Sequence, residues 1–174
     1  MSLDGSDAAA RGDLLAARAG ELLVARSLRV AVAESCTGGL VLHHLTNIPG
    51  SSKYVEGGVV AYSNEAKVWL LGVRSNTLRK FGAVSEPAAR EMARGVRLRL
   101  KADVGLAITG IAGPGGGSPD KPVGLVYIAL STEEDEWCER HIWTGNRLAN
   151  KQQSALAALD LLLRYLAGDL GFPV

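Results

Sequence analysis

The sequence predicts an α/β protein with three layers, α/β/α, built on a mixed sheet of about five strands. Short apolar runs typical of buried strands alternate with segments of helical spacing through the first two thirds of the chain. Two further strand-like runs then follow one another directly, which predicts a hairpin and therefore an antiparallel pair. The 174 residues, 47% hydrophobic and 21% charged, are enough for one globular domain with a substantial core.

The first twelve residues are small and polar, and we expect residues 1–12 to be a disordered N-terminal tail. Residues 13–170 are predicted to form a single domain. Its first element is a helix, because apolar side chains recur at helical spacing, at Leu15, Ala19, Leu22 and Leu23.

Four segments follow in which strand-like and helix-like patterns alternate, at residues 28–33 (strand), 36–46 (helix), 57–62 (strand) and 63–71 (helix). The composition of residues 48–52, Ile-Pro-Gly-Ser-Ser, predicts a turn between the second and third of these segments. Ser63 or Asn64 is the expected cap of the later helix, and Gly72 its end.

A further helix is predicted to begin at Ser85, with Pro87 in its first turn. Apolar residues continue it at helical spacing and are expected to face the core, at Ala89, Met92, Ala93, Val96 and Leu100. The remaining elements are expected at residues 104–109, 123–130 and 137–143 (strands) and at residues 147–167 (helix, ending at Gly168).

Charge and cysteine content narrow the class of protein. The formal net charge is +1, so we expect neither a nucleic acid nor a membrane as partner. An arginine-rich stretch at residues 90–101 fits the solvated face of an amphipathic helix better than a nucleic-acid surface. Two distant cysteines, with no CxxC pair and no secretory signal, predict a reduced, cytoplasmic protein. No metal-ligand spacing is present, and no metal is expected.

Three predicted strand ends carry polar or glycine residues, namely Ser35, Tyr62 and the pair Thr109-Gly110. In open α/β sheets, ligands bind at the carboxyl ends of the strands. We therefore expect these residues to converge on one pocket.

The first of these strand ends reads Ala-Glu-Ser-Cys-Thr-Gly-Gly at residues 33–39. Main-chain N–H groups at the start of a helix attract an anion or a developing oxyanion. The alternative is structural: Ser35 or Thr37 caps the helix, and the glycines make a tight turn.

Ser35 and Cys36 are both candidate nucleophiles. Cysteine is intrinsically more reactive, but cysteine hydrolases pair the thiol with histidine, and none lies in the three turns. Serine can instead be activated by a buried, neutral lysine, and Lys67 is the best placed. Tyr62 could relay a proton or orient the serine. The alternative for Lys67 is a solvated surface cation.

The stretch Gly-Ile-Ala-Gly-Pro-Gly-Gly-Gly-Ser at residues 110–118 is the densest in glycine. It is neither a P-loop nor a dinucleotide fingerprint. Bare backbone at a strand end can cradle a phosphate, and Arg147 could add a charged contact. The alternatives are that the glycines only make turns and that Arg147 is a surface cation.

Five motifs in order resemble the CinA C-terminal domain family, from about residue 14 to residue 166. They are the stretch at 33–39, Tyr-Ser-Asn-Glu-Ala-Lys at 62–67, Gly-Ala-Val-Ser-Glu at 82–86, Thr-Gly-Ile-Ala-Gly-Pro at 109–114 and Lys-Pro-Val-Gly at 121–124. The resemblance implies a three-layer α/β/α fold with a mixed sheet. It also implies a nicotinamide-nucleotide amidase, which converts nicotinamide mononucleotide to nicotinate mononucleotide and ammonia in pyridine nucleotide salvage.

Position by position, the resemblance implies that Ser35 is the nucleophile, Lys67 its general base and Tyr62 an assisting group. The oxyanion is expected at main-chain N–H groups near residues 37–39. The substrate side of the pocket is expected to comprise Thr37, Gly38, Gly39, Ser52, Thr109, Gly110, Gly113, Gly116 and Arg147.

One departure is that the family often has Gly-Asp-Arg where this chain has Gly-Asn-Arg at residues 145–147, which puts the orientation of the arginine in question. No cofactor is expected. The expected partners are a small-molecule nucleotide substrate and further copies of the chain, as a homo-oligomer. Two alternatives stay open: a nucleotide-binding module without catalysis, and a serine amidase acting on another small amide.

Overall fold

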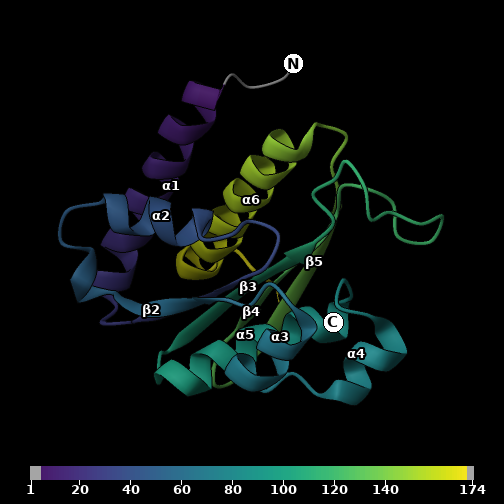
Figure 1. The fold of residues 1–174 in the computed structure, drawn as a ribbon. Coiled ribbons are helices and arrows are strands. Elements are labelled where there is room, and N and C mark those ends of the chain that lie inside the picture. The colour runs from purple at the N-terminus through teal and green to yellow at the C-terminus, as the bar shows by residue number, and fades with distance from the viewer. Residues whose placement is uncertain (1–4, 172–174) are drawn as a thin grey trace.

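A computed structural model describes residues 5–171 and contains one open sheet (Figure 1). Its five strands are β1 (Val30–Glu34), β2 (Val55–Val60), β3 (Val104–Gly110), β4 (Leu125–Ser131) and β5 (Glu136–Ile142). They lie in the order β2-β1-β3-β4-β5, so the first strand is central and β2 and β5 are the edges.

The sheet is mixed, as predicted. Strand β1 runs parallel to both of its neighbours, with Glu34 opposite Val60 of β2 and Ile108 of β3. Strands β3, β4 and β5 are paired antiparallel. The carboxyl ends of β1, β2 and β3 therefore lie side by side at one end of the sheet.

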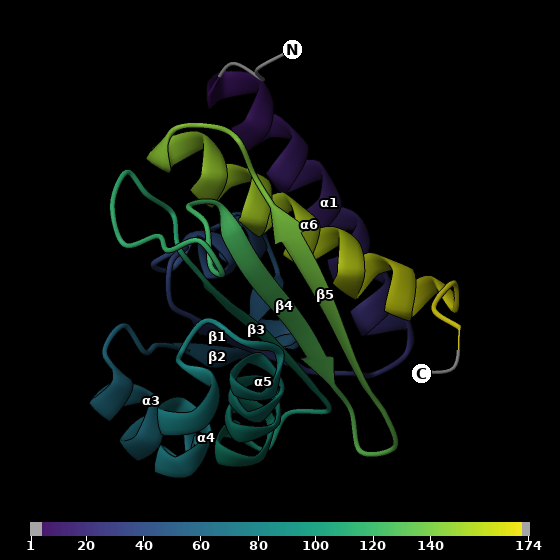
Figure 2. The ribbon, with the colours of Figure 1, turned by 90° about the vertical axis from the view of Figure 1, so that its right-hand side faces the viewer.

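Helices cover both faces of the sheet and complete the predicted α/β/α layers (Figure 2). One layer contains α1 (Gly5–Ala25), α2 (Leu40–Asn47) and α6 (Arg147–Ala167). The other contains α3 (Asn64–Leu71), α4 (Ser75–Phe81) and α5 (Glu86–Leu100). A short 3₁₀ helix, Ser51–Lys53, precedes β2.

The central strand β1 shows why two layers are needed. Its side chains alternate between the faces: Val30 and Val32 pack with α1 and α6, whereas Ala31 and Ala33 pack with α5. Burial of each such valine contributes about 1.5–3 kcal/mol. Small residues on the α5 side let that helix lie close to the sheet, and a Cβ on Gly105 would lie 2.1 Å from the carbonyl oxygen of Ala93.

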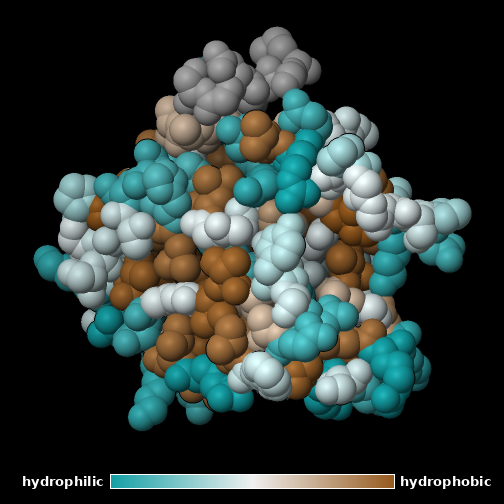
Figure 3. All heavy atoms as spheres, in the orientation of Figure 1, coloured by the Kyte–Doolittle hydropathy of each residue, from teal (hydrophilic) through white to brown (hydrophobic). Residues whose placement is uncertain are grey.

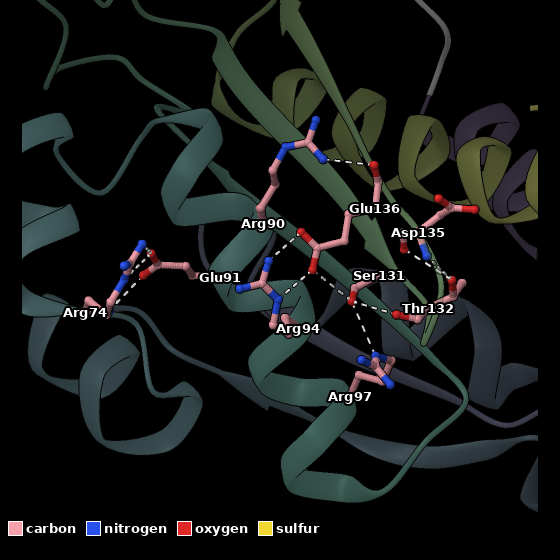
Figure 4. A network of polar contacts seen from close by, with 9 residues as sticks. All are labelled: Arg74, Arg90, Glu91, Arg94, Arg97, Ser131, Thr132, Asp135 and Glu136. Carbon is pink, nitrogen blue, oxygen red and sulfur yellow. Dashed lines mark hydrogen bonds and ion pairs between the residues drawn. The ribbon is translucent and has the colours of Figure 1, made fainter. Parts of the chain in front are cut away.

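The arginines of α5 are held by partners within the chain (Figure 4). Nε and Nη2 of Arg94 donate to the Glu136 carboxylate at 2.7 and 2.8 Å, and Arg97 donates to Ser131 at 3.3 Å. Arg90 donates to the main-chain oxygen of Glu136. These contacts fasten α5 to the β4–β5 hairpin and give three of the arginines in residues 90–101 a structural role.

Some element bounds differ from the sequence prediction: α2 begins at Leu40 instead of residue 36, and strand ends shift by one or two residues. Two larger differences concern α1 and α4. The tail expected at residues 1–12 is wrong over residues 5–12, which form the start of α1; residues 1–4 lie outside the described residues. Alanines at positions 8–10 favour a helix, Ala8 is buried, and Gly12 lies against the ring of His44. The short helix α4 was not predicted, because only Thr77 and Leu78 of its residues turn inward.

The open edge of the sheet at β2 carries exposed apolar side chains. Val60 is 47% exposed and Leu70, in the neighbouring α3, is 48% exposed. Figure 3 shows apolar side chains grouped near the middle of the molecular face that it draws. Self-association remains a prediction. Among the described helices, none combines the length and the apolar character needed to cross a membrane.

Candidate active site

The three polar strand ends meet, as predicted. Ser35 follows β1, Tyr62 follows β2, and Thr109 and Gly110 close β3; all four line one cavity of about 180 Å³. Arg147, from the start of α6, lines the same cavity. Parallel strands in register put these residues together although they are far apart in the sequence.

Lys67 lies at the bottom of this cavity and is 1% exposed. The N-cap Ser63 starts α3 by accepting a hydrogen bond from the Ala66 N–H at 3.0 Å, which places Lys67 one turn into the helix. The lysine Nζ lies 3.0 Å from Ser35 Oγ. The alternative interpretation of Lys67 as a solvated surface cation is therefore wrong.

Two main-chain carbonyls hold the lysine amine in place. Nζ donates to the oxygens of Ala61 at 3.0 Å and Tyr62 at 3.1 Å. Burial lowers the pKa of Lys67 from its ordinary value. A neutral amine has two N–H donors and one lone pair, so when both carbonyls are satisfied the lone pair is left to face the hydroxyl of Ser35.

The thiol of the neighbouring Cys36 has its pKa shifted in the opposite direction to that of Lys67. Burial raises the pKa of Cys36 to about 11, and the charge of Glu34 adds to the effect. The thiol is therefore protonated near neutral pH. Since the thiolate is the nucleophilic form, these surroundings favour Ser35 over Cys36.

The turn between β1 and α2 does not use its small polar residues as caps. The N-cap of α2 is Gly39, in the left-handed region with φ 100°, and it makes no side-chain cap. Ser35 Oγ is bound by Lys67 instead, and Thr37 Oγ1 is buried without a hydrogen-bond partner among the described residues. The alternative in which Ser35 or Thr37 caps the helix is wrong.

The main-chain donors of this turn are only partly available. The Gly39 N–H donates to the carboxylate of Glu34, and the Gly38 N–H donates to the oxygen of Ser35. Within residues 5–171, the N–H groups of Cys36 and Thr37 donate to no other residue. Of the predicted donors at residues 37–39, the N–H groups of Gly38 and Gly39 are therefore occupied within the chain, and that of Thr37 is not.

Tyr62 makes contacts that differ from the prediction. Its side chain is 61% exposed, and its hydroxyl accepts a hydrogen bond from Arg147 Nη2 at 3.1 Å. The contact to Lys67 comes from its main-chain oxygen. No hydrogen bond joins its hydroxyl to Ser35 or Lys67 in the described structure, so the predicted proton relay has no contact to run through.

Arg147 is oriented by two groups of the site. Nη1 donates to the oxygen of Gly113 at 2.7 Å, and Nη2 to Tyr62. The preceding residue, Asn146, caps α6 by accepting from the Ala149 N–H at 3.0 Å. The amide thus supplies a cap oxygen at the position where an aspartate would supply one, and Arg147 is held by Gly113 and Tyr62.

Loops 81–84 and 110–124 close the remaining walls. Thr109 donates its hydroxyl to the oxygen of Ala83 at 2.9 Å, and Lys121 donates to the oxygens of Phe81 and Val84. Gly110 lies against Cys36, since a Cβ there would be 3.1 Å from the sulfur. These contacts tie the two loops to each other beside Ser35.

Two buried side chains that support the site were missed by the sequence analysis. Asn150 donates to the oxygen of Ala112 and accepts from the N–H of Gly145, which fixes the glycine loop to α6. Glu34 binds the start of α2. An acidic residue inside an otherwise apolar strand was the available signal for Glu34, because a buried carboxylate needs donors.

Of the predicted substrate residues, Thr109, Gly110 and Arg147 line the cavity, whereas six do not: Thr37, Gly38, Gly39, Ser52, Gly113 and Gly116. Ser52 is exposed in the 3₁₀ helix before β2, at the end of the sheet opposite to Tyr62. Gly116 is exposed in the glycine loop and does not line the cavity. A turn composition shows that residues are accessible but not which end of the sheet they occupy.

In the described part of the chain, the larger cavities contain no buried lysine next to a serine. One of about 510 Å³ lies between α1 and residues 48–54, and the two charged residues that line it, Glu21 and Lys53, are exposed. Within residues 5–171, no group of three histidine, cysteine or acidic residues is arranged to hold a metal ion. The cavity at Ser35 is the candidate active site because of its buried lysine and serine.

Comparison with known proteins gives one consistent result. Residues 13–166 match the model of the CinA C-terminal domain. The CinA-like protein of Amoebophilus asiaticus is 54% identical over 139 residues, which are 80% of this chain and 33% of that protein. The chain spans about a third of the length of the curated relatives it matches.

Solved structures agree over almost their whole length. The competence/damage inducible protein CihA from Agrobacterium tumefaciens is 40% identical with a TM-score of 0.88, covering 96% of this chain and 99% of that one. A CinA superfamily protein from Klebsiella pneumoniae is 36% identical with a TM-score of 0.87, covering 90% and 98%.

Proposed function

The chain belongs to the CinA C-terminal domain family, and from that premise we propose that it deamidates nicotinamide mononucleotide to nicotinate mononucleotide and ammonia. The observation that carries an amidase is the 3.0 Å contact between Lys67 Nζ and Ser35 Oγ in a buried site. The choice of substrate rests on the five ordered motifs, since the names of the relatives specify no reaction.

In the first step, the neutral amine of Lys67 takes the proton of Ser35 while Oγ attacks the carboxamide carbon. General-base catalysis of this kind contributes about 10²–10⁴-fold to the rate. The lowered pKa of Lys67 supports this role, because a smaller free energy is needed to keep the amine neutral before attack.

The tetrahedral intermediate carries a negative oxygen. We assign its donors to the N–H groups of Cys36 and Thr37, which no other described residue occupies. Each such donor is worth about 2.7–4 kcal/mol in the transition state. Cys36 thus takes part through its main chain, while its protonated thiol forms part of the wall.

The protonated Lys67 then gives its proton to the departing nitrogen, which leaves as ammonia, and the carbonyl reforms as an ester of Ser35. Water attacks this ester while Lys67 takes one of its protons, the bond from the acyl carbon to Ser35 Oγ breaks, and Lys67 returns the proton to Oγ as the acid product leaves. The sum is amide plus water to acid plus ammonia, and every proton moves between the substrate, water, Ser35 and Lys67.

The phosphate is assigned to the mouth of the cavity. A volume of about 180 Å³ is below the range of about 300–1,000 Å³ that encloses drug-sized ligands. The nicotinamide ring would enter, and the ribose phosphate would lie outside, next to Arg147. This guanidinium is exposed, pairs with no described carboxylate and is held by Gly113 and Tyr62.

The test is ammonia release from nicotinamide mononucleotide by wild type, Ser35→Ala and Cys36→Ala. We expect activity in wild type and Cys36→Ala and none in Ser35→Ala. An active Ser35→Ala with an inactive Cys36→Ala would make the nucleophile assignment wrong. Nucleotide binding without ammonia release would establish a binding module, and release from other small amides alone would establish a different amidase.

A further inference from the structure

Glu34 is a buried carboxylate next to the nucleophile that the proposed reaction does not use. It is the last residue of β1 and is 0% exposed. Its two oxygens accept hydrogen bonds from the N–H groups of Gly39 and Leu42, both at 2.9 Å. No ion pair with a described residue accompanies these contacts, so the charge is held by the first turn of α2 alone.

These two bonds close the catalytic turn. The side chain leaves the backbone one residue before Ser35 and is bound again at Gly39, so it spans residues 35–38 from one side to the other. Gly38 and Gly39 are left-handed, with φ 67° and 100°, and neither supplies a side chain to fix the turn. The conformation of the turn therefore depends on the carboxylate.

The same bonds decide which donors are left for substrate. N-terminal N–H groups of a helix attract negative charge. At α2, Glu34 already occupies those of Gly39 and Leu42, so an oxyanion cannot be drawn to them. Among the N–H groups of this turn that donate to no described residue, those of Cys36 and Thr37 directly follow Ser35 in the chain.

We propose that Glu34 is a positioning residue: its carboxylate fixes the turn so that the Cys36 and Thr37 N–H groups face the carboxamide oxygen when Ser35 attacks. This inference rests on the proposed amidase function. Oxyanion donors act only when they lie about 2.7–3.1 Å from the oxygen of the intermediate. A turn that relaxes therefore slows the chemical step while the distant phosphate contact, and with it KM, is unaffected.

A purely structural role, in which Glu34 only stabilises α2, makes a different prediction, and Glu91 provides the matched control. Glu91 also holds the start of a helix, because its carboxylate accepts from the N–H of Arg74, the N-cap of α4 (Figure 4). It does not line the active-site cavity. Loss of its charge should lower stability without changing the reaction.

The experiment compares Glu34→Gln with Glu91→Gln. Glutamine keeps the shape but turns an NH₂ group toward one of the two N–H donors. We expect kcat for ammonia release to fall about 10–100-fold in Glu34→Gln, less than the loss of a whole oxyanion donor. KM should stay within about threefold of wild type. Glu91→Gln should keep the wild-type kcat, with all assays run well below each unfolding midpoint.

A second readout does not depend on the natural substrate. A fluorophosphonate forms a bond from phosphorus to Ser35 Oγ and releases fluoride, through an oxyanion at the same donors, and mass spectrometry measures the labelling rate. We expect slower labelling in Glu34→Gln and in Glu34→Asp, whose shorter side chain cannot span the turn, and unchanged labelling in Glu91→Gln.

The inference is overturned if both Glu34 variants keep the wild-type kcat and labelling rate and only their unfolding midpoints fall, as in Glu91→Gln. It is separate from the choice of substrate. If wild type is labelled at Ser35 but releases no ammonia from nicotinamide mononucleotide, and Glu34→Gln is labelled more slowly, then the proposed substrate fails and the role of Glu34 stands.

Discussion

Helix α2 and the other helices that begin near the site start in different ways. Ser63, Ser85 and Asn146 each cap their own helix through a side-chain oxygen, whereas α2 begins at Gly39 without a side-chain cap. Serine and threonine are present before α2, but the capping is done by Glu34. Because of this, Ser35 is free to interact with Lys67.

The comparison shows that a small polar residue at a strand-to-helix turn has no fixed meaning. What separates a cap from a nucleophile is whether another group already satisfies the helix N–H donors. At α3 the hydroxyl of Ser63 satisfies one of them, and at α2 the hydroxyl of Ser35 does not.

The largest expected effect comes from comparing alanine substitutions of two serines, Ser35 and Ser63. Ser35→Ala should reduce ammonia release by about 10³-fold or more, since nucleophile and base act as a unit, with little change in the unfolding midpoint. Ser63→Ala should cost about 1 kcal/mol of stability, which lowers the midpoint by about 2–4 °C for a chain of this size. An ammonia assay and thermal denaturation measure both, and a large stability loss in Ser35→Ala would break the comparison.

The next largest expected effect tests Lys67, the hydrogen-bond partner of Ser35. Lys67→Met should lower kcat/KM by about 10²–10⁴-fold, the contribution of a general base. In wild type, kcat/KM should rise with pH as Lys67 loses its proton. Because burial lowers this pKa, the midpoint of the rise should lie below the ordinary lysine pKa of about 10.4. A rise centred on the ordinary value would show that the lysine is not desolvated in the working enzyme.

A smaller effect concerns α6, whose start combines a cap with a substrate contact. Arg147→Ala should raise KM for nicotinamide mononucleotide about 10–100-fold, equivalent to about 1.4–2.8 kcal/mol of lost phosphate binding. Turnover of nicotinamide riboside, which lacks the phosphate, should change little. Equal losses on both substrates would mean that Arg147 supports the site through Gly113 and Tyr62 instead of binding phosphate.

The smallest expected effect concerns Asn146, the N-cap residue of α6 that precedes Arg147. Asn146→Asp places a negative charge at the N-terminus of α6, where the helix dipole favours it by about 0.3–1 kcal/mol. The unfolding midpoint should rise by a few degrees at most, and the gain should shrink in high salt because the charge is exposed. A loss of stability would mean that the amide nitrogen of Asn146 makes a contact that the carboxylate cannot replace.

The sequence predicted those features of the fold that depend on local periodicity. The last helix was predicted with its observed bounds, and the caps Ser63 and Ser85 were identified from composition. Strand ends shifted by one to two residues, because an apolar run does not mark where pairing stops. Helix α4 was missed because only Thr77 and Leu78 turn inward, so its sequence shows no apolar periodicity; a contact such as that of Glu91 with Thr77 is visible only in the structure.

The meeting of side chains was predicted where it follows directly from the strand ends, as for Ser35, Tyr62 and Thr109. It was not predicted where a role depends on what a side chain reaches. The Tyr62 hydroxyl contacts Arg147 instead of Ser35, and Ser52 lies at the opposite end of the sheet. The function of Glu34 depends on two N–H groups whose directions only the folded turn defines.

In the turn between β1 and α2, Glu34 binds the helix donors and Ser35 contacts Lys67, and this separation of roles also affects how the family can diverge. Ser35 Oγ satisfies no helix donor, and Lys67 keeps two main-chain acceptors without it. A gene copy that loses this serine should therefore encode a protein that still folds and still has the cavity lined by Arg147. Selection for binding alone can then preserve such a copy, so catalytically silent members are an expected product of duplication.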